Sequence, residues 1–174
     1  MKTFNKTILV LMAVAALSFT SCSKNDDGGS DPDGGTGTFS AKVNGDFFAS
    51  MEGTVAGQIT QSGPTKVFAI SAGTTQSQNL QMIVTTFDGV GTYDLNFVNI
   101  GTYSYLPDPS NPDPNTVVIF TTGNGQSSNG QLKVSSFDGD VAKGTFSFTA
   151  YNLDNLSESV SVTDGEFNIK MTVK

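Results

Sequence analysis

The sequence predicts an all-β fold, a single antiparallel β-sandwich or barrel-like domain of about ten short strands over residues 38–174. Apolar and polar residues alternate with a period of two in several segments, as they do in strands with one buried face. Glycine-containing turn pairs separate these segments at short intervals. No segment of this part has the 3.6-residue apolar stripe of an amphipathic helix.

The clearest predicted strand lies at the C-terminal end of the sequence. Phe167, Ile169, Met171 and Val173 alternate with polar residues there, so we expect all four side chains to point into the core. Two other segments alternate in the same way, and their expected inward residues are Tyr93, Leu95, Phe97, Phe146, Phe148 and Ala150.

Turn chemistry predicts where strands reverse. Asn44-Gly45 and Asp164-Gly165 are pairs typical of tight hairpins, because glycine readily adopts a positive φ. Two stretches that begin at Gln81 and Gln131 also echo one another. Each has a strand, a Phe-Asp-Gly turn, and then Gly-Thr and an aromatic residue that open the next strand. We interpret the echo as a repeated hairpin. The functional alternative is a duplicated site at Asp88 and Asp138.

Residues 1–21 have the parts of a secretory signal peptide. Lys2 and Lys6 precede an apolar core, residues 8–17, and small residues lead to Cys22, the single cysteine. The core is too short to span a bilayer as a helix, which needs about 20 apolar residues. The alternative is a buried N-terminal helix with a free core cysteine. We expect no transmembrane helix in the mature chain.

Two short motifs in this region resemble those of bacterial lipoproteins. Ser21-Cys22 resembles a lipobox, which implies cleavage before Cys22 and acylation of its thiol and new amino group. Several acyl chains then anchor the protein to the outer membrane, as one chain would not. The following residues resemble the Bacteroidota lipoprotein export signal, which implies display on the cell surface; the periplasmic face is the alternative. That signal comprises Ser23, Lys24, Asn25, Asp26 and Asp27.

Residues 22–37 are therefore predicted to be the lipidated cysteine and a flexible tether. Glycine, serine and aspartate dominate this stretch, which has no large apolar residue to bury. A flexible chain of this length reaches roughly 20 Å.

Composition narrows the functions open to the chain. All nine basic residues are lysines, and histidine and tryptophan are absent. Without histidine there is no Ser-His-Asp triad and no imidazole metal site, and one cysteine cannot form a disulfide within the chain. Removal of Lys2 and Lys6 leaves seven lysines against 16 acidic residues, a formal charge of −9. That charge argues against nucleic acid as a partner. We expect neither a metal nor a cofactor.

The ordered set FSAKVNGDFFA, GTYDL, GTFSFTAYN and VTDGEFNI resembles a family of uncharacterised Bacteroidota surface lipoproteins with a domain of unknown function. The resemblance covers roughly residues 38–174 together with the lipobox. It implies an all-β domain tethered to the surface. It carries no site residues, because no activity is attached to that family.

The function that we expect is non-catalytic: a surface-anchored binding or accessory module for an extracellular glycan or protein. Tyr103 and Tyr105 lie two apart, so in a strand they share a face. They lead into a proline-rich loop with Asp108 and Asp113, and these four residues are the candidate ligand contacts. The alternative is that the tyrosines only cover the edge of the core.

Two other functions remain open. One is a structural or assembly component of the outer-membrane surface, in which a strand is added to a neighbouring protein. The other, less favoured, is a glycosidase that uses a pair of carboxylates, with no catalytic residues assigned. The acids available for it lie in or beside turns: Asp88, Asp94, Asp138 and Asp140.

Overall fold

The computed structural model describes residues 37–124 and 129–174, which form an all-β domain as predicted. One short 3₁₀ helix, Pro114–Thr116, interrupts the strands. The strands are β1 (Thr38–Val43), β2 (Asp46–Ala49), β3 (Ala56–Ser62), β4 (Thr65–Gly73), β5 (Gln78–Val84), β6 (Gly91–Leu95), β7 (Ile100–Tyr105), β8 (Val118–Thr121), β9 (Gly130–Phe137), β10 (Val141–Asn152) and β11 (Ser159–Val173).

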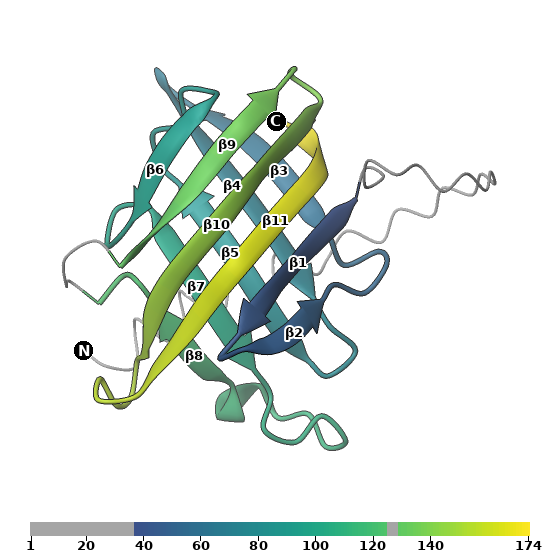
Figure 1. The fold of residues 1–174 in the computed structure, drawn as a ribbon, viewed down its shortest axis with the longest axis vertical. Coiled ribbons are helices and arrows are strands. Elements are labelled where there is room, and N and C mark those ends of the chain that lie inside the picture. Colours follow the sequence, from purple (N-terminus) through teal and green to yellow (C-terminus); the bar gives the residue numbers. More distant parts are fainter. Residues whose placement is uncertain (1–36, 125–128) are drawn as a thin grey trace. The chain divides into compact units, whose positions relative to one another are not determined.

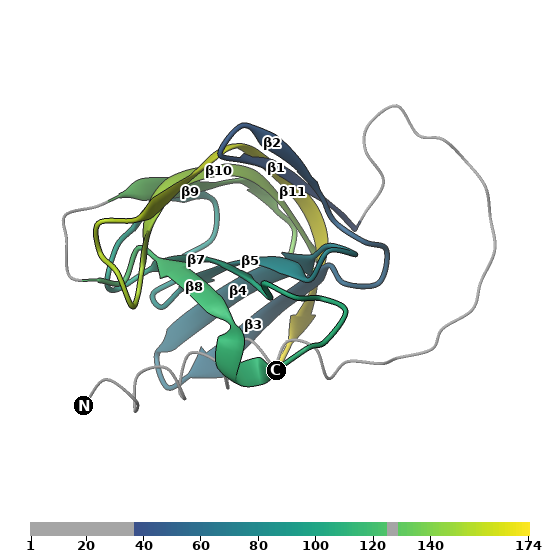
Figure 2. The same ribbon diagram turned by 90° about the horizontal axis from the view of Figure 1, so that it is seen from below.

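The strands form two facing layers that are joined at both edges. One layer runs β2-β1-β11-β10-β9-β6 and the other runs β3-β4-β5-β7-β8 (Figure 2). Pairing of β11 with β3 joins the layers at one edge, and pairing of β10 with β8 joins them at the other. The result is a closed ring of strands, which is why the sandwich and the barrel-like descriptions both fit. The long β10 and β11 cross the domain diagonally (Figure 1).

One pairing departs from the expected antiparallel order. Met171–Val173 at the end of β11 runs parallel to Gly57–Ile59 of β3, so the sheet is mixed. Gly57 is needed at this junction because a Cβ there would lie 2.5 Å from the sulfur of Met171 and 2.8 Å from Cγ2 of Ile169. The missing side chain lets β3 approach β11 closely.

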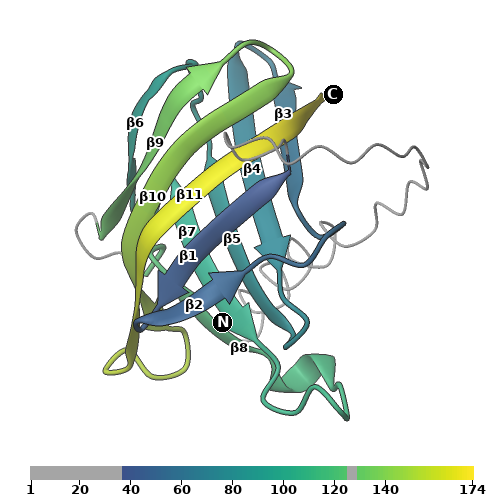
Figure 3. The same ribbon diagram turned by 45° about the vertical axis from the view of Figure 1, so that its right-hand side comes forward.

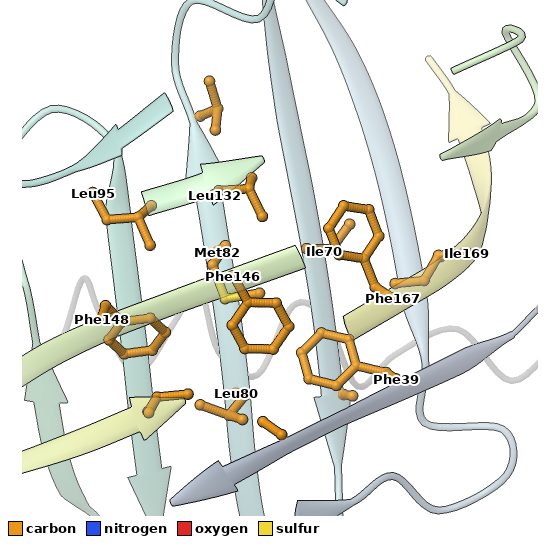
Figure 4. Close-up of a cluster of buried hydrophobic side chains, with 14 of the residues drawn as sticks. Phe39, Ile70, Leu80, Met82, Leu95, Leu132, Phe146, Phe148, Phe167 and Ile169 are labelled. Carbon is orange, nitrogen blue, oxygen red and sulfur yellow. The ribbon is translucent and has the colours of Figure 1, made fainter. Parts of the chain in front are cut away.

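The space between the layers is filled by apolar side chains. Figure 4 shows residues from both layers pointing toward one another, among them Phe39, Leu80, Met82, Phe146 and Phe148. The predicted inward residues of β10 are buried, and so are Phe167, Ile169 and Met171 of β11. The alternation in the sequence therefore identified much of the core.

Two expected core residues face solvent instead. Phe97 is 65% exposed because β6 ends at Leu95 and a turn follows, in which the Asn96 side chain accepts a hydrogen bond from the Val98 amide. Val173 is 63% exposed, since the pairing of β10 along β11 ends at Lys170 and only β3 accompanies the last residues.

The two turn predictions have different outcomes. Asn44-Gly45 does form the tight turn between β1 and β2, with φ of 52° and 90° (Figure 3). Asp164-Gly165 does not reverse the chain; that prediction was wrong. The pair lies inside the continuous β11, where the register with both β1 and β10 shifts by one residue.

The shift marks a β-bulge, and tertiary packing explains why it needs these residues. Asp164 takes the positive φ of 50°. A Cβ on Gly165 would lie 2.5 Å from the ring and from the carbonyl oxygen of Phe146 on β10. Asp164-Gly165, a pair typical of turns, thus forms a bulge within a strand here and leaves room for Phe146.

The repeated hairpin is confirmed in one copy and wrong in the other. Residues 138–140 join β9 to β10 as a hairpin. Residues 85–90 instead carry the chain from β5 in one layer to β6 in the other, because β5 pairs with β4 and β7 whereas β6 pairs with β9. A local sequence pattern cannot distinguish the two connections.

The lipoprotein features of the sequence lie outside the described residues. These are the signal peptide, Cys22 and the residues Ser23, Lys24, Asn25, Asp26 and Asp27. Within the described ranges, no helix has the length and apolar character required to cross a membrane.

Candidate functional site

A pocket opens at one end of the ring, between the β1–β2 hairpin of one layer and strands β5, β7 and β8 of the other. This end is the lower one in Figure 1. Its volume is about 390 Å³. We call it the tyrosine pocket, and its lining combines aromatic, aliphatic and uncharged polar groups with one carboxylate. The lining residues are Val43, Asn44, Asp46, Phe47, Phe48, Gln76, Gln78, Tyr103, Tyr105, Phe120 and Val160.

Strand β7 supplies the two tyrosines predicted from the sequence. Tyr103 and Tyr105 both line the pocket, and their ring centroids are 5.9 Å apart with a tilt of 37°. Tyr103 also contacts Phe120 of β8 at 6.2 Å. Tyr103 is only 6% exposed and belongs to the hydrophobic core, whereas Tyr105 is half-buried against it. Both interpretations of this pair, pocket lining and core edge, thus apply to Tyr103.

Burial raises the pKa of Tyr103 above its ordinary value, and the neighbouring phenol of Tyr105 adds to the rise. A hydrogen bond with the Gln78 side chain acts in the opposite direction. The Tyr103 hydroxyl is therefore protonated at neutral pH and serves as an uncharged donor and acceptor.

The β1–β2 hairpin supplies the facing wall. The side-chain oxygen of Asn44 accepts a hydrogen bond of 2.9 Å from the Ser161 amide, which ties the turn to the start of β11. Asp46 and Phe47 follow the turn in the sequence and are also part of the lining, and the Phe47 side chain is 74% exposed. Neither residue was predicted to be part of a site, although Phe47-Phe48 in one strand must place one ring on each face.

The predicted aspartates do not line the pocket. Asp108 accepts hydrogen bonds from the amides of Ser110 at 3.0 Å and Asn111 at 3.3 Å. Asp113 caps the 3₁₀ helix by accepting from the Asn115 amide at 2.9 Å. Both carboxylates hold local turns of an exposed loop. The structure thus joins the two tyrosines in one pocket and leaves Asp108 and Asp113 outside it.

A second pocket lies at the opposite end of the domain, where the two Phe-Asp-Gly stretches meet. Its volume is about 430 Å³, and Phe87, Asp88, Lys66 and Phe137 are part of its lining. The rings of Phe87 and Phe137 pack edge to face at 5.5 Å. Asp88 lines this pocket but Asp138 does not, so the echo does not assemble a duplicated pair of carboxylates there.

Two of the acids considered for catalysis, Asp138 and Asp94, are held by hydrogen bonds. The pKa of Asp138 lies below its usual range because the amides of Val141 and Asp140 donate to its carboxylate, which is opposite to the change that a general acid needs. Asp94 accepts from the Gln131 side chain at 3.2 Å. Each of the two pockets has one carboxylate in its lining, Asp46 or Asp88. Neither holds the carboxylate pair on which glycoside hydrolysis depends.

Metal-ligating side chains do not gather in the part of the chain that the structure covers. Over residues 37–124 and 129–174, no group of three or more histidine, cysteine, aspartate or glutamate side chains could hold an ion. The chemistry that the tyrosine pocket offers is therefore ring contact, hydrogen bonding and the single negative charge of Asp46.

Comparison with known proteins identifies the family of this chain but gives no activity. No curated protein and no solved structure matches the chain. The profile of one family, described as a domain of unknown function (DUF6252), matches residues 35–169, which include nearly all of the β-domain. The chain therefore belongs to the DUF6252 family.

Proposed function

We propose that this protein is a surface-anchored lipoprotein whose β-domain binds an extracellular ligand, a glycan or a protein, without catalysing a reaction. The tyrosine pocket is the observation that carries the proposal. It combines aromatic rings with amide, hydroxyl and carboxylate groups at an open end of the domain, and recognition sites commonly have this composition.

The direction of β1 supports display of the pocket. The strand begins at Thr38, which pairs with Asn168, and ends at Val43 in the pocket lining. Six residues of strand separate these ends by roughly 16 Å. A tether attached before Thr38 would therefore hold the domain at a point remote from the pocket, which leaves the pocket accessible.

The binding function is tested by purifying the intact lipoprotein from its native membrane and identifying what accompanies it. Phe47→Ala should then weaken capture of that ligand at least about fivefold, the effect of losing roughly 1 kcal/mol of contact. Phe97→Ala is the matched control, because Phe97 is also exposed but lies outside the pocket. Equal binding by both variants and the wild type would show that the pocket does not take part in binding this ligand.

The anchor is tested by mass spectrometry of the mature N-terminal peptide. We expect residues 1–21 to be absent and Cys22 to carry a lipid-sized mass increment. An unmodified thiol on the mature protein would contradict the anchor.

The surface address is tested by changing Lys24, Asp26 and Asp27 together to alanine. Lipidation and folding should persist, while protease accessibility on whole cells should fall. Unchanged accessibility would mean that these charges are only solvated linker, and that another signal decides between the surface and the periplasmic face.

A second candidate function, assembly with a neighbouring surface protein, is favoured by the free edges of one layer. In the described ranges β2 pairs only with β1, and β6 pairs only with β9. An unpaired edge can accept a strand from a partner. Co-purification of a stoichiometric membrane protein that is retained by Phe47→Ala would favour assembly over ligand capture.

A further inference from the structure

The tyrosine pocket has a curved aromatic wall. The Tyr103 ring is tilted by 37° to Tyr105 and by 42° to Phe120, with centroids 5.9 and 6.2 Å away. Phe48 reaches the same pocket from the opposite layer, and the exposed Phe47 is also part of the lining. Tilted rings that meet from two layers make a concave surface, which suits a compact rounded group better than a flat sugar ring stacked on one exposed face.

The charge in the pocket lining is negative. Asp46 is the ionisable carboxylate in the lining, and no lysine lines the pocket. The connections at the same end, residues 44–46, 74–77, 106–117 and 153–158, also contain no lysine. Their acidic residues are Asp46, Asp108, Asp113, Asp154 and Glu158.

Lys42 is the lysine beside the pocket, because it pairs with Phe47 and precedes Val43 of the lining, whereas the other lysines of the domain lie elsewhere. Lys42 of β1 is paired with Asp164 at 2.9 Å, and Lys66 lines the second pocket at the other end. The remaining ones lie on β9, β10, β11 and at the C-terminal residue. The acidic side chains at the pocket end outnumber Lys42, and Lys42 is held in an ion pair. The pocket end therefore has a negative field, which attracts cations and repels anions.

From these two observations we propose that the tyrosine pocket recognises an alkylammonium group, held by cation–π contact with its rings and by the charge of Asp46. The inference rests on the proposed binding function and names its ligand chemistry. Aromatic rings attract an ammonium group electrostatically when it sits over their faces, and a nearby carboxylate adds to that attraction. An anionic ligand would find no cation in the lining.

The test is an NMR or calorimetric titration of the mature chain with choline. Its uncharged isostere, 3,3-dimethylbutan-1-ol, has the same shape and is the matched ligand control. We expect saturable choline binding at least about fivefold tighter than binding of the isostere, a factor that corresponds to roughly 1 kcal/mol of cation–π attraction. Choline binding no tighter than that of the isostere, or no saturable binding of either, would overturn the proposal.

The source of the ammonium group is distinguished by a second ligand, Nα-acetyl-lysine N-methylamide. Tighter binding of this compound than of choline points to a lysine side chain of a protein partner. Tighter choline binding points to a small quaternary ammonium compound. Either result supports the alkylammonium proposal if the uncharged isostere binds more weakly than both.

Protein variants locate the binding. Asp46→Asn removes the charge but keeps the shape, so it should weaken choline binding severalfold, while Asp88→Asn at the other end should leave it unchanged. Tyr105→Phe should retain binding because it retains the ring, whereas Tyr105→Ala should lose it. Equal effects of Asp46→Asn and Asp88→Asn would show that only the overall charge matters and would overturn the pocket assignment.

Failure of the ammonium proposal is separable from failure of the proposed function. If choline does not bind but a native ligand is captured and its binding is weakened by Phe47→Ala, the pocket binds a ligand of another chemistry, and only the ammonium assignment is wrong. If the native ligand is also unaffected by Phe47→Ala, the binding function of the pocket fails as well.

Discussion

At the scale of single residues, burial decides which of two neighbouring side chains matters for stability. Phe167 is 3% exposed and its ring lies 6.4 Å from that of Phe68 in the opposite layer. Lys170, three residues later on β11, has a largely exposed side chain and a loose contact of 3.9 Å with Asp140. The alternation along the strand places one inside and the other outside.

Phe167→Ala should therefore lower the free energy of unfolding by about 3–5 kcal/mol. The loss is large compared with the total stability of a domain, roughly 5–15 kcal/mol, so Tm should fall by many degrees. Lys170→Ala is the control and should change stability by less than about 0.5 kcal/mol. Thermal and denaturant unfolding measure both, and two small equal effects would contradict the assigned inward face.

The raised pKa of Tyr103 predicts how the stability of the domain changes at alkaline pH. Its pKa in the folded protein is raised by burial and by Tyr105, so the unfolded chain ionises first, near the ordinary value of about 10. This contribution to stability is complete below that pH and is lost as the pH rises through the folded pKa. Tyr103→Phe should make the alkaline decline shallower, as measured by denaturant unfolding between about pH 9 and 11.

The control for this experiment is Tyr151→Phe on β10, which removes a hydroxyl outside the pocket lining. It shows how far loss of a tyrosine hydroxyl elsewhere in the domain changes the pH profile. An alkaline decline that Tyr103→Phe leaves unaltered would mean that the ionisation of other groups dominates.

At the scale of elements, β11 shows how a strand can contain a turn signal without turning. Strands β1 and β10 flank β11 on both sides, and each pairing continues past the bulge with a one-residue shift. Hydrogen bonding on two sides holds the chain extended on either side of Asp164, although Asp-Gly favours reversal when it stands alone. Tertiary pairing overrides the local preference.

The positive φ of Asp164 gives a test of the bulge. Asp164→Val places a β-branched residue in the left-handed region, which costs about 1–2 kcal/mol. Asp164→Asn is the control, because asparagine tolerates this conformation and the variant also loses the exposed ion pair with Lys42. Denaturant unfolding should show Asp164→Val to be the less stable by about 1 kcal/mol or more. Equal stabilities would argue that β11 adjusts without strain.

At the scale of the whole molecule, the last residues of β11 close the ring. Met171 is 4% exposed and pairs with Gly57, and the Lys174 amide donates to the Ile59 carbonyl at 2.9 Å. The family match ends at residue 169, so this junction lies beyond the matched segment. Without this junction, β3 would lose its pairing with the opposite layer.

Deletion of residues 171–174 should therefore destabilise the domain by more than the roughly 2–5 kcal/mol expected for truncating a buried methionine alone. The reason is that the deletion removes strand pairing as well as the side chain. Val173→Ala, at a position that is 63% exposed, should stay within about 0.5 kcal/mol of the wild type. A deletion variant that melts within a few degrees of the wild type would show that the ring does not depend on this edge.

Local patterns in the sequence were sufficient for the fold class, for the inward faces of β10 and most of β11, and for the Asn44-Gly45 hairpin. Alternation and turn chemistry act between residues that are close in the chain, so a single sequence displays them. The pairing of Tyr103 with Tyr105 on one face of a strand followed from the same period of two.

Only the tertiary structure decided the closure of the ring, the parallel junction of β11 with β3 and the use of Asp164-Gly165 as a bulge. It also decided the lining of the tyrosine pocket, which brings Asp46 and Phe47 together with tyrosines that are more than fifty positions later in the chain. These features depend on which strands become neighbours. Strand pairing is set by the packing of the whole core, and residues far apart in the sequence contain no local signal of it.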